Sequence, residues 1–180
     1  MSASEGAVSK YKADGSYSVI GDVEPEGICA TGLVDIIAEL VRNGTVEESG
    51  YMEEDYALSE MVKVTPADIR EFQLAKSAVM SAIKCLLGHG NVTYSDIEKM
   101  YIAGGFSVQL NIENASYLGL VPKELADRFV PINNSSLLGT VRFVCEKNDL
   151  TEITEKAEFI DLGVDNTFSE LFFENMVFGQ

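Results

Sequence analysis

The clearest pattern of apolar and polar positions lies between residues 65 and 87, where apolar side chains recur with a helical period. Thr65 can act as an N-cap, Pro66 suits the first helical position, and Asp68 puts a negative charge in the first turn. We therefore predict a long helix that stops at Gly88. Its apolar residues are Ile69, Phe72, Val79, Ile83 and Leu86 or Leu87.

A second helical pattern covers about residues 31 to 43. Thr31 can accept hydrogen bonds as its N-cap, and Gly44 can follow its last turn in the C′ position. The pattern predicts an amphipathic helix. Its apolar face consists of Leu33, Ile36, Ile37 and Leu40.

Strand-like segments alternate with helical ones along the rest of the chain. Residues 8–12 and 17–20 flank an Asp14–Gly15 step, which is typical of a hairpin. Residues 100–103 have the pattern of a buried strand that ends at two glycines. The alternation indicates an α/β protein. The other predicted strands are 61–64, 130–132 and 159–162, and the other predicted helices are 111–118, 122–129, 134–145, 149–157 and 167–175.

Charge is strongly unbalanced, with 13 Lys and Arg against 29 Asp and Glu and a net charge of −16. Such a surface repels nucleic acid, so we expect no nucleic-acid partner. Acidic residues concentrate at 47–55 and 149–158, which are either solvated faces or docking sites for a basic partner. The apolar runs are too short to cross a bilayer and no signal peptide is visible, so a cytoplasmic location is expected.

The cysteines and the histidine exclude several kinds of chemistry. Cys29, Cys85 and Cys145 are far apart and lack the spacing of a zinc or iron–sulfur site, so we expect three buried, reduced thiols and no metal in this chain. His89 lies between two glycines and is expected in a turn. One histidine cannot supply a Ser-His-Asp or Cys-His set, and no carboxylate pair is marked by its pattern. We therefore predict no catalytic residues.

Two features suggest a binding site. Gly104 and Gly105 follow a strand directly, which lets the main chain approach a ligand or simply makes a tight turn. On the long predicted helix, four residues share one stripe because they stand at i, i+3, i+4 and i+7. The stripe could contact a base or a ribose, or it could be a solvated face. Its members are Gln73, Lys76, Ser77 and Met80.

Two further glycine-containing segments are candidates. Residues 27–32 form a turn that opens a helix, and a helix N-terminus attracts anions, although a closely packed turn has the same composition. Gly139 lies inside the predicted helix 134–145, where a glycine costs roughly 1 kcal/mol relative to alanine. We therefore expect Gly139 to mark a close contact with another element.

Taken in order, these segments resemble one family. The run from Glu24 to Asp35, the run from Thr65 to Lys76 and the run from Tyr101 to Phe106 are similar to the C-terminal region of ATP-dependent reductive activators of corrinoid proteins. Residues 112–122, 133–139 and 168–178 fit the same family. The resemblance extends from about residue 19 to the end of the chain.

The resemblance implies a fold and a site. The family belongs to the superfamily of actin, sugar kinases and heat-shock chaperones, so the chain is expected to be the second lobe of an actin-like, ribonuclease-H-like ATPase fold, with a mixed sheet flanked by helices. Residues 1–180 would form this single lobe, with a hairpin at 1–24 and an acidic excursion at 45–62. The residues implied to bind nucleotide are Gly104, Gly105, Phe106, Gln73, Lys76, Ser77 and Met80.

The resemblance also implies an activity. Members bind ATP, with Mg²⁺, and help an electron move uphill from an N-terminal [2Fe–2S] domain to Co(II), restoring Co(I) in corrinoid-dependent methyltransferase systems. The ferredoxin domain and the phosphate-loop lobe are not recognisable in this chain, and Ser107 replaces a glycine of the family pattern. We therefore expect an inactive, weakly adenosine-binding lobe that associates with itself through surfaces left exposed. The alternative is an interaction module that no longer binds nucleotide.

Overall fold

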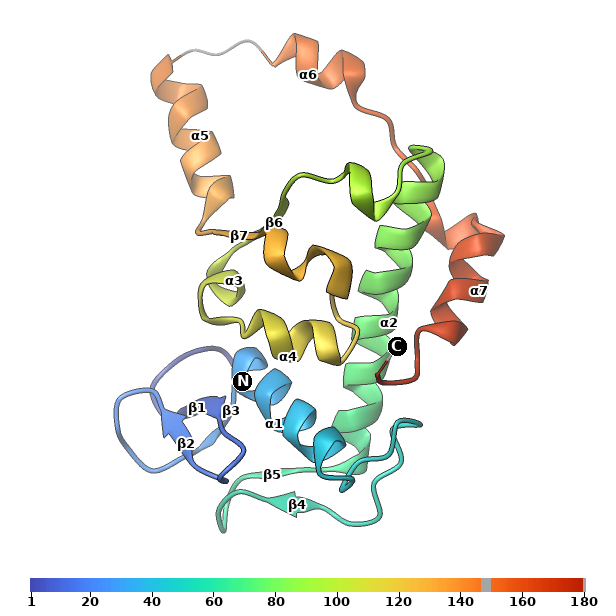
Figure 1. The fold of residues 1–180 in the computed structure, drawn as a ribbon. Coiled ribbons are helices and arrows are strands. Elements are labelled where there is room, and N and C mark those ends of the chain that lie inside the picture. The colour runs from blue at the N-terminus through green and yellow to red at the C-terminus, as the bar shows by residue number, and fades with distance from the viewer. Residues whose placement is uncertain (147–149, 180) are drawn as a thin grey trace.

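The computed structural model describes residues 1–146 and 150–179, which form helices and three small sheets (Figure 1). In the first sheet, β1 (Ala7–Tyr11) lies between β2 (Tyr17–Val19), which is antiparallel to it, and β3 (Gly27–Ile28), which is parallel. The predicted hairpin is therefore confirmed, and Gly15 turns it with a φ of +83°. This sheet is mixed, as the resemblance implies.

The other two sheets are pairs of strands. The short strands β4 (Tyr56–Ala57) and β5 (Lys63–Val64) run antiparallel beside the acidic excursion. The strands β6 (Met100–Ala103) and β7 (Phe129–Ile132) run parallel and in register. The strand predicted at 100–103 is confirmed, but the prediction that it is buried is wrong, because a two-stranded sheet leaves side chains open to solvent and Tyr101 is 57% exposed.

The core forms where helix α1 (Ala30–Arg42) packs on β1 and on α4 (Ile112–Tyr117). Ile36 and Ile37 are fully buried, and each contributes about 1.5–3 kcal/mol by leaving water. Gly32 allows the close approach, since a Cβ there would collide with the main-chain carbonyl oxygen of Val8. The N-cap of α1 is Cys29, so the prediction for Thr31 is wrong. Thr31 lies in the first turn and donates to the Ser9 carbonyl oxygen instead.

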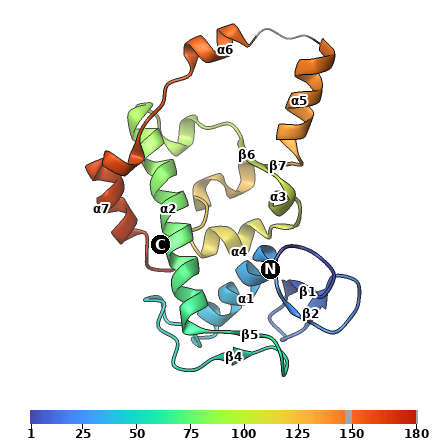
Figure 2. The same cartoon turned by 180° about the vertical axis from the view of Figure 1, so that it is seen from behind.

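Helix α2 (Pro66–His89) begins as predicted, with a reciprocal capping box between Thr65 and Asp68. It continues through Gly88 and ends at Gly90, so His89 is its last residue rather than part of a turn. The His89 Nε2 lies 2.8 Å from an Asp165 carboxylate oxygen, and this hydrogen bond lowers the pKa of Asp165. Helix α7 (Asn166–Glu174) packs alongside α2 (Figure 2).

Short elements connect these parts. A 3₁₀ turn, η1 (Tyr94–Asp96), precedes β6, and helix α3 (Gly105–Gln109) follows it. A second 3₁₀ turn, η2 (Lys123–Arg128), precedes β7. The strand predicted at 159–162 is absent from the described residues, because Phe159 is 88% exposed with no strand beside it and the chain turns through η3 (Leu162–Val164).

Helices α5 (Ser135–Glu146) and α6 (Thr151–Lys156) extend away from the body as an arm (Figure 1). The start predicted for the helix 149–157 lies outside the described residues. No residue of α5 is buried, and a Cβ at Gly139 would meet no atom within 4 Å. The contact predicted for Gly139 is therefore not made within the described chain. Cys145 is exposed on the same helix, so only Cys29 and Cys85 are buried as predicted.

Candidate functional site

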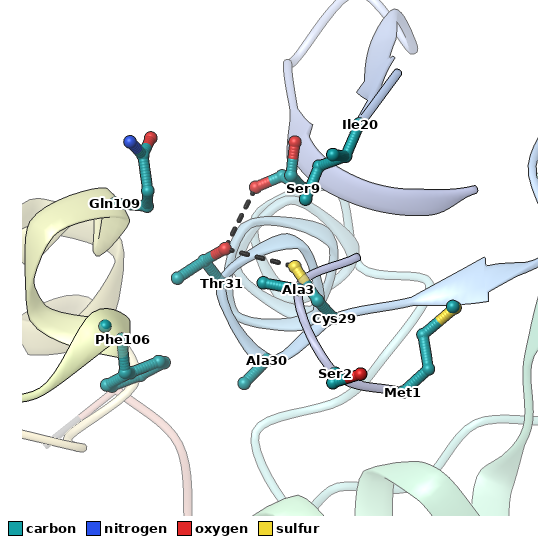
Figure 3. Close-up of a pocket in the computed structure, with 11 residues that line it drawn as sticks. Met1, Ser2, Ala3, Ser9, Ile20, Cys29, Ala30, Thr31, Phe106 and Gln109 are labelled. Atoms are coloured by element: carbon teal, nitrogen blue, oxygen red, sulfur yellow. Dashed lines mark hydrogen bonds between the residues drawn. The ribbon is translucent and has the colours of Figure 1, made fainter. Parts of the chain in front are cut away.

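A cavity of about 460 Å³ lies between the glycine pair and the start of α1. We call it the glycine-loop cavity. Phe106 lies on one side and Cys29 and Thr31 lie on the other (Figure 3), and Gly105 also lines the cavity. Two segments that the sequence suggested separately, the glycine pair and the turn at 27–32, therefore meet at one place.

The main chain at Gly104 is held in a conformation that favours glycine, with a φ of +90°. Its N–H donates to the carbonyl oxygens of Ile132 and Asn133 at 3.1 and 3.0 Å, which fixes the loop to the end of β7. Ser107 is 1% exposed, and its hydroxyl donates to the Gly104 carbonyl oxygen at 2.8 Å. The serine that departs from the family pattern thus stabilises this loop through its main chain.

The loop also lies where ligands bind in related architectures. Strands β6 and β7 are parallel, and both end beside Gly104. In open α/β sheets, ligands bind outside the carboxyl ends of the strands. The glycine pair therefore follows the carboxyl ends of both strands, where its main chain also makes a turn.

The first turn of α1 brings positive potential to the cavity. Cys29 makes no side-chain cap, and the first turn contains no acidic residue. The Thr31 hydroxyl donates to Ser9 and lies 3.3 Å from the Cys29 sulfur (Figure 3). The first N–H groups of a helix have no partner within the helix, so this end can accept an anion.

The stripe on α2 is buried, so the interpretation as a solvated face is wrong. Gln73 donates from Nε2 to the carbonyl oxygens of Ser49 and Met176, at 2.9 and 3.0 Å. Lys76 donates to the Val177 carbonyl oxygen. The bonds to Met176 and Val177 tie α2 to the C-terminal segment 175–178, and the bond to Ser49 ties it to the acidic excursion.

The rest of the stripe has the same surroundings. Ser77 is fully buried and donates to the Phe172 carbonyl oxygen. Beyond the stripe, Phe178 is 1% exposed and its ring lies 6.2 Å from that of Phe72. The C-terminal segment thus covers the face that the spacing marked out, which no local pattern in residues 65–87 could reveal.

Lys76 is the least ordinary member of the stripe. Its side chain is buried, with an exposed fraction of only 2%, and its Nζ lies 5.2 Å from the centre of the Phe178 ring. Burial, and then the positive charge of Lys84, lower the pKa of Lys76 to about 8. Lys76 and Met80 line a second cavity of about 140 Å³, which we call the lysine cavity. It shares no lining residue with the glycine-loop cavity.

Sequence reasoning missed a buried carboxylate near the first site. Asp35 accepts from the Tyr11 main-chain N–H at 3.3 Å and from Asn114 Nδ2 at 2.7 Å. Burial raises the pKa of Asp35. The carboxylate therefore joins α1 to β1 and α4. The sequence signal for this buried group is an acidic residue on the apolar side of the helix predicted at 31–43.

Among the described residues, no cluster of three or more His, Cys, Asp or Glu side chains could hold a metal ion. In the same residues, no helix is both long and apolar enough to cross a bilayer.

The whole chain, residues 1–180, matches the family described as the C-terminal domain of RACo, the ASKHA domain. It is 27% identical over 214 residues to the corrinoid activation enzyme RamQ of Eubacterium limosum, an alignment that covers 99% of this chain and 36% of that protein. A solved structure titled reductive activator for corrinoid, iron-sulfur protein is similar with a TM-score of 0.86 and 29% identity, over 99% of this chain and 33% of that one. The chain thus spans about a third of the length of both relatives.

These similarities confirm the actin-like fold and the resemblance that the sequence motifs carried. They cover the glycine-loop cavity and the α2 stripe alike, and they do not by themselves say which of the two contacts a ligand. By fold and by sequence, this chain belongs to the family of C-terminal ASKHA domains of reductive activators of corrinoid proteins.

Proposed function

We propose that this chain is the nucleotide-binding part of a reductive activator of corrinoid proteins, and that the glycine-loop cavity is its share of an ATP site. One observation carries the proposal: Gly105, the second glycine of the loop, and the uncapped first turn of α1 line the same cavity. The glycines allow the main chain to approach a base or sugar, and the helix end attracts a phosphate. A volume of about 460 Å³ is within the range of small-molecule sites.

In this proposal, Phe106 supplies an apolar surface in the cavity, and the α2 stripe acts indirectly. Gln73, Lys76 and Ser77 use their polar atoms to bind the main chain of the C-terminal region. We therefore assign these three residues the role of fixing the C-terminal region on α2 rather than that of a direct nucleotide contact.

The activity belongs to the longer protein. ATP with Mg²⁺ would support electron transfer from a [2Fe–2S] cluster in an N-terminal ferredoxin domain to the cobalt of a corrinoid protein, restoring Co(I) for a methyltransferase system. This chain would supply one wall of the nucleotide site, and α5 would lie at the junction with the other lobe. Without a triphosphate cradle it loses most charge-assisted phosphate contacts. We therefore expect weak adenosine binding and no catalysis from the chain alone.

A pair of matched glycine variants tests the proposal. Gly105 lines the cavity and Gly139 lies on the arm, and an added Cβ meets no atom within 4 Å at either position. Calorimetric titration with adenosine should give weak binding that Gly105→Ala reduces and Gly139→Ala leaves unchanged. Equal effects of the two substitutions would contradict the site. Micromolar, magnesium-dependent ATP binding by this chain would contradict the expected weak affinity.

A second candidate function is an interaction module without nucleotide. The exposed apolar side chains of α5 favour it, because Leu138 is 61% and Val144 is 67% exposed. Adenosine that binds neither the chain nor its Gly139→Ala variant would support this candidate over the first.

A further inference from the structure

The lysine cavity has an unusual concentration of positive charge. Lys76, Lys84 and Lys123 all line this cavity of about 140 Å³ between α2, η2 and the C-terminal segment. The chain as a whole has 13 basic and 29 acidic residues. Three lysine residues line this one small cavity, although the molecule as a whole is strongly acidic.

These ammonium groups have no carboxylate partner in residues 1–146 and 150–179. The ion pairs of that part of the chain involve other basic residues: Arg42, Lys63, His89, Arg128 and Lys156. Lys76 donates to the Val177 carbonyl oxygen and Lys84 to Asn175 Oδ1, at 2.7 Å in the second case. Both acceptors are neutral. An ammonium has three N–H donors, so each can also serve an anion.

The buried positive charge in the cavity favours the binding of an anion. A buried ammonium without a counter-ion is unfavourable, and the charge of Lys84 adds to the effect of burial in lowering the pKa of Lys76 to about 8. One carboxylate, Glu124, also lines the cavity, yet it forms no ion pair with these lysines among the described residues. The uncompensated charge therefore remains positive.

The size of the cavity restricts the ligand. Its volume of about 140 Å³ lies below the range of about 300–1,000 Å³ for pockets that hold drug-sized ligands. Gly119 keeps one wall open, because a Cβ there would stand 3.4 Å from Lys76 Nζ. The space suits a small tetrahedral oxyanion.

We propose that the lysine cavity is a binding site for a small oxyanion of the phosphate or sulfate type, held by Lys84 and Lys123 with Lys76 at its base. Lysine binds phosphate as a point charge, which this arrangement supplies three times. No residue of this site lines the glycine-loop cavity, so the inference does not rest on the nucleotide proposal.

The test is a titration of the whole chain with inorganic phosphate, followed by NMR in a phosphate-free buffer. We expect saturable binding at roughly millimolar concentrations or below, weakened about tenfold by Lys84→Met and by Lys123→Met. Lys63→Met is the matched control, because Lys63 is an exposed lysine paired with Asp55 on a separate sheet and the charge change is the same. Phosphate should also raise the pKa of Lys76, read from its side-chain resonances.

Two results would overturn the inference: no saturable phosphate binding, or equal weakening by Lys63→Met and Lys84→Met. A parallel titration with adenosine diphosphate identifies the source of the oxyanion. If adenosine diphosphate competes with phosphate, and Lys84→Met weakens this competition, the site binds a nucleotide phosphate. If adenosine diphosphate does not compete, the site binds a free oxyanion.

Discussion

The body of the molecule and its α5–α6 arm both contain amphipathic helices, but the apolar face is buried only in the body. In the body, the apolar face of α1 is buried against β1 and α4, with Ile36 and Leu40 fully removed from solvent. In the arm, α5 has an apolar face of similar period, yet no residue of it is buried. The pattern therefore indicates that a face can be buried, and the rest of the chain decides whether it is.

The largest expected effect is in the body, at Gly32. Gly32→Ala places a methyl group against the main-chain carbonyl of Val8. Because the colliding atoms belong to the main chain, no side chain can move to remove the clash. We expect it to lower the free energy of unfolding by about 3 kcal/mol, measured by urea denaturation. A loss below about 1 kcal/mol would mean that α1 does not approach β1 this closely.

The next effect concerns Lys76 and depends on pH. Its pKa is about 8 in the folded chain and about 10.5 when unfolded, so the unfolded state binds the extra proton between these values. Stability should therefore rise as pH increases from 8 to 10.5, by at most about 3–4 kcal/mol, and this gain is lost as pH falls through 8.

Lys76→Met provides the control for that pH effect. The variant cannot titrate at this position, so its thermal unfolding should show a smaller rise over the same window. Identical dependence of stability on pH in the wild type and in Lys76→Met would show that folding does not lower the pKa of Lys76. The comparison must be made without phosphate, which would occupy the proposed oxyanion site.

A smaller effect is expected in the arm, where we expect the chain to associate with itself through α5. Leu137 and Val144 lie seven residues apart on this helix and are 57% and 67% exposed. Replacing both with Glu should reduce concentration-dependent association in light scattering without lowering the unfolding temperature. A monomeric wild type at high concentration would contradict this prediction.

The smallest effect is expected for Gly139→Ala, which should stabilise its helix slightly, whereas Gly32→Ala should destabilise the body. The added Cβ meets no atom within 4 Å, and alanine favours the helix by roughly 0.5–1 kcal/mol over glycine. We expect a slight gain in the helicity of α5, measured by circular dichroism. A clear loss of stability would mean that α5 already packs against another element through Gly139.

Local patterns predicted most elements, because caps and glycines act within a few residues. The N-cap at Thr65 and the hairpin at Gly15 are examples. Partners far away in sequence were not predictable in this way. Three of the four carbonyl oxygens that accept hydrogen bonds from the α2 stripe come from residues about 100 positions later. The exposure of β6 depends on how few strands its sheet has.

In the candidate site, too, local features were predictable from the sequence and tertiary contacts were not. The sequence marked Gly104 and Gly105, and their strand-end position is as expected. The joining of this loop to the α1 N-terminus depends on tertiary structure, as does the separation of Lys76 into another cavity. Thr31 was misplaced as a cap because its hydroxyl prefers the Ser9 carbonyl oxygen, a partner 22 residues away.

The most direct test of the account is an NMR titration of this chain with adenosine, followed at its backbone amides. The account predicts shifts at Gly104, Gly105 and Phe106, together with shifts at Ala30 and Thr31 across the glycine-loop cavity. Shifts confined to Gln73, Lys76, Ser77 and Met80, or no shifts at saturating adenosine, would contradict it.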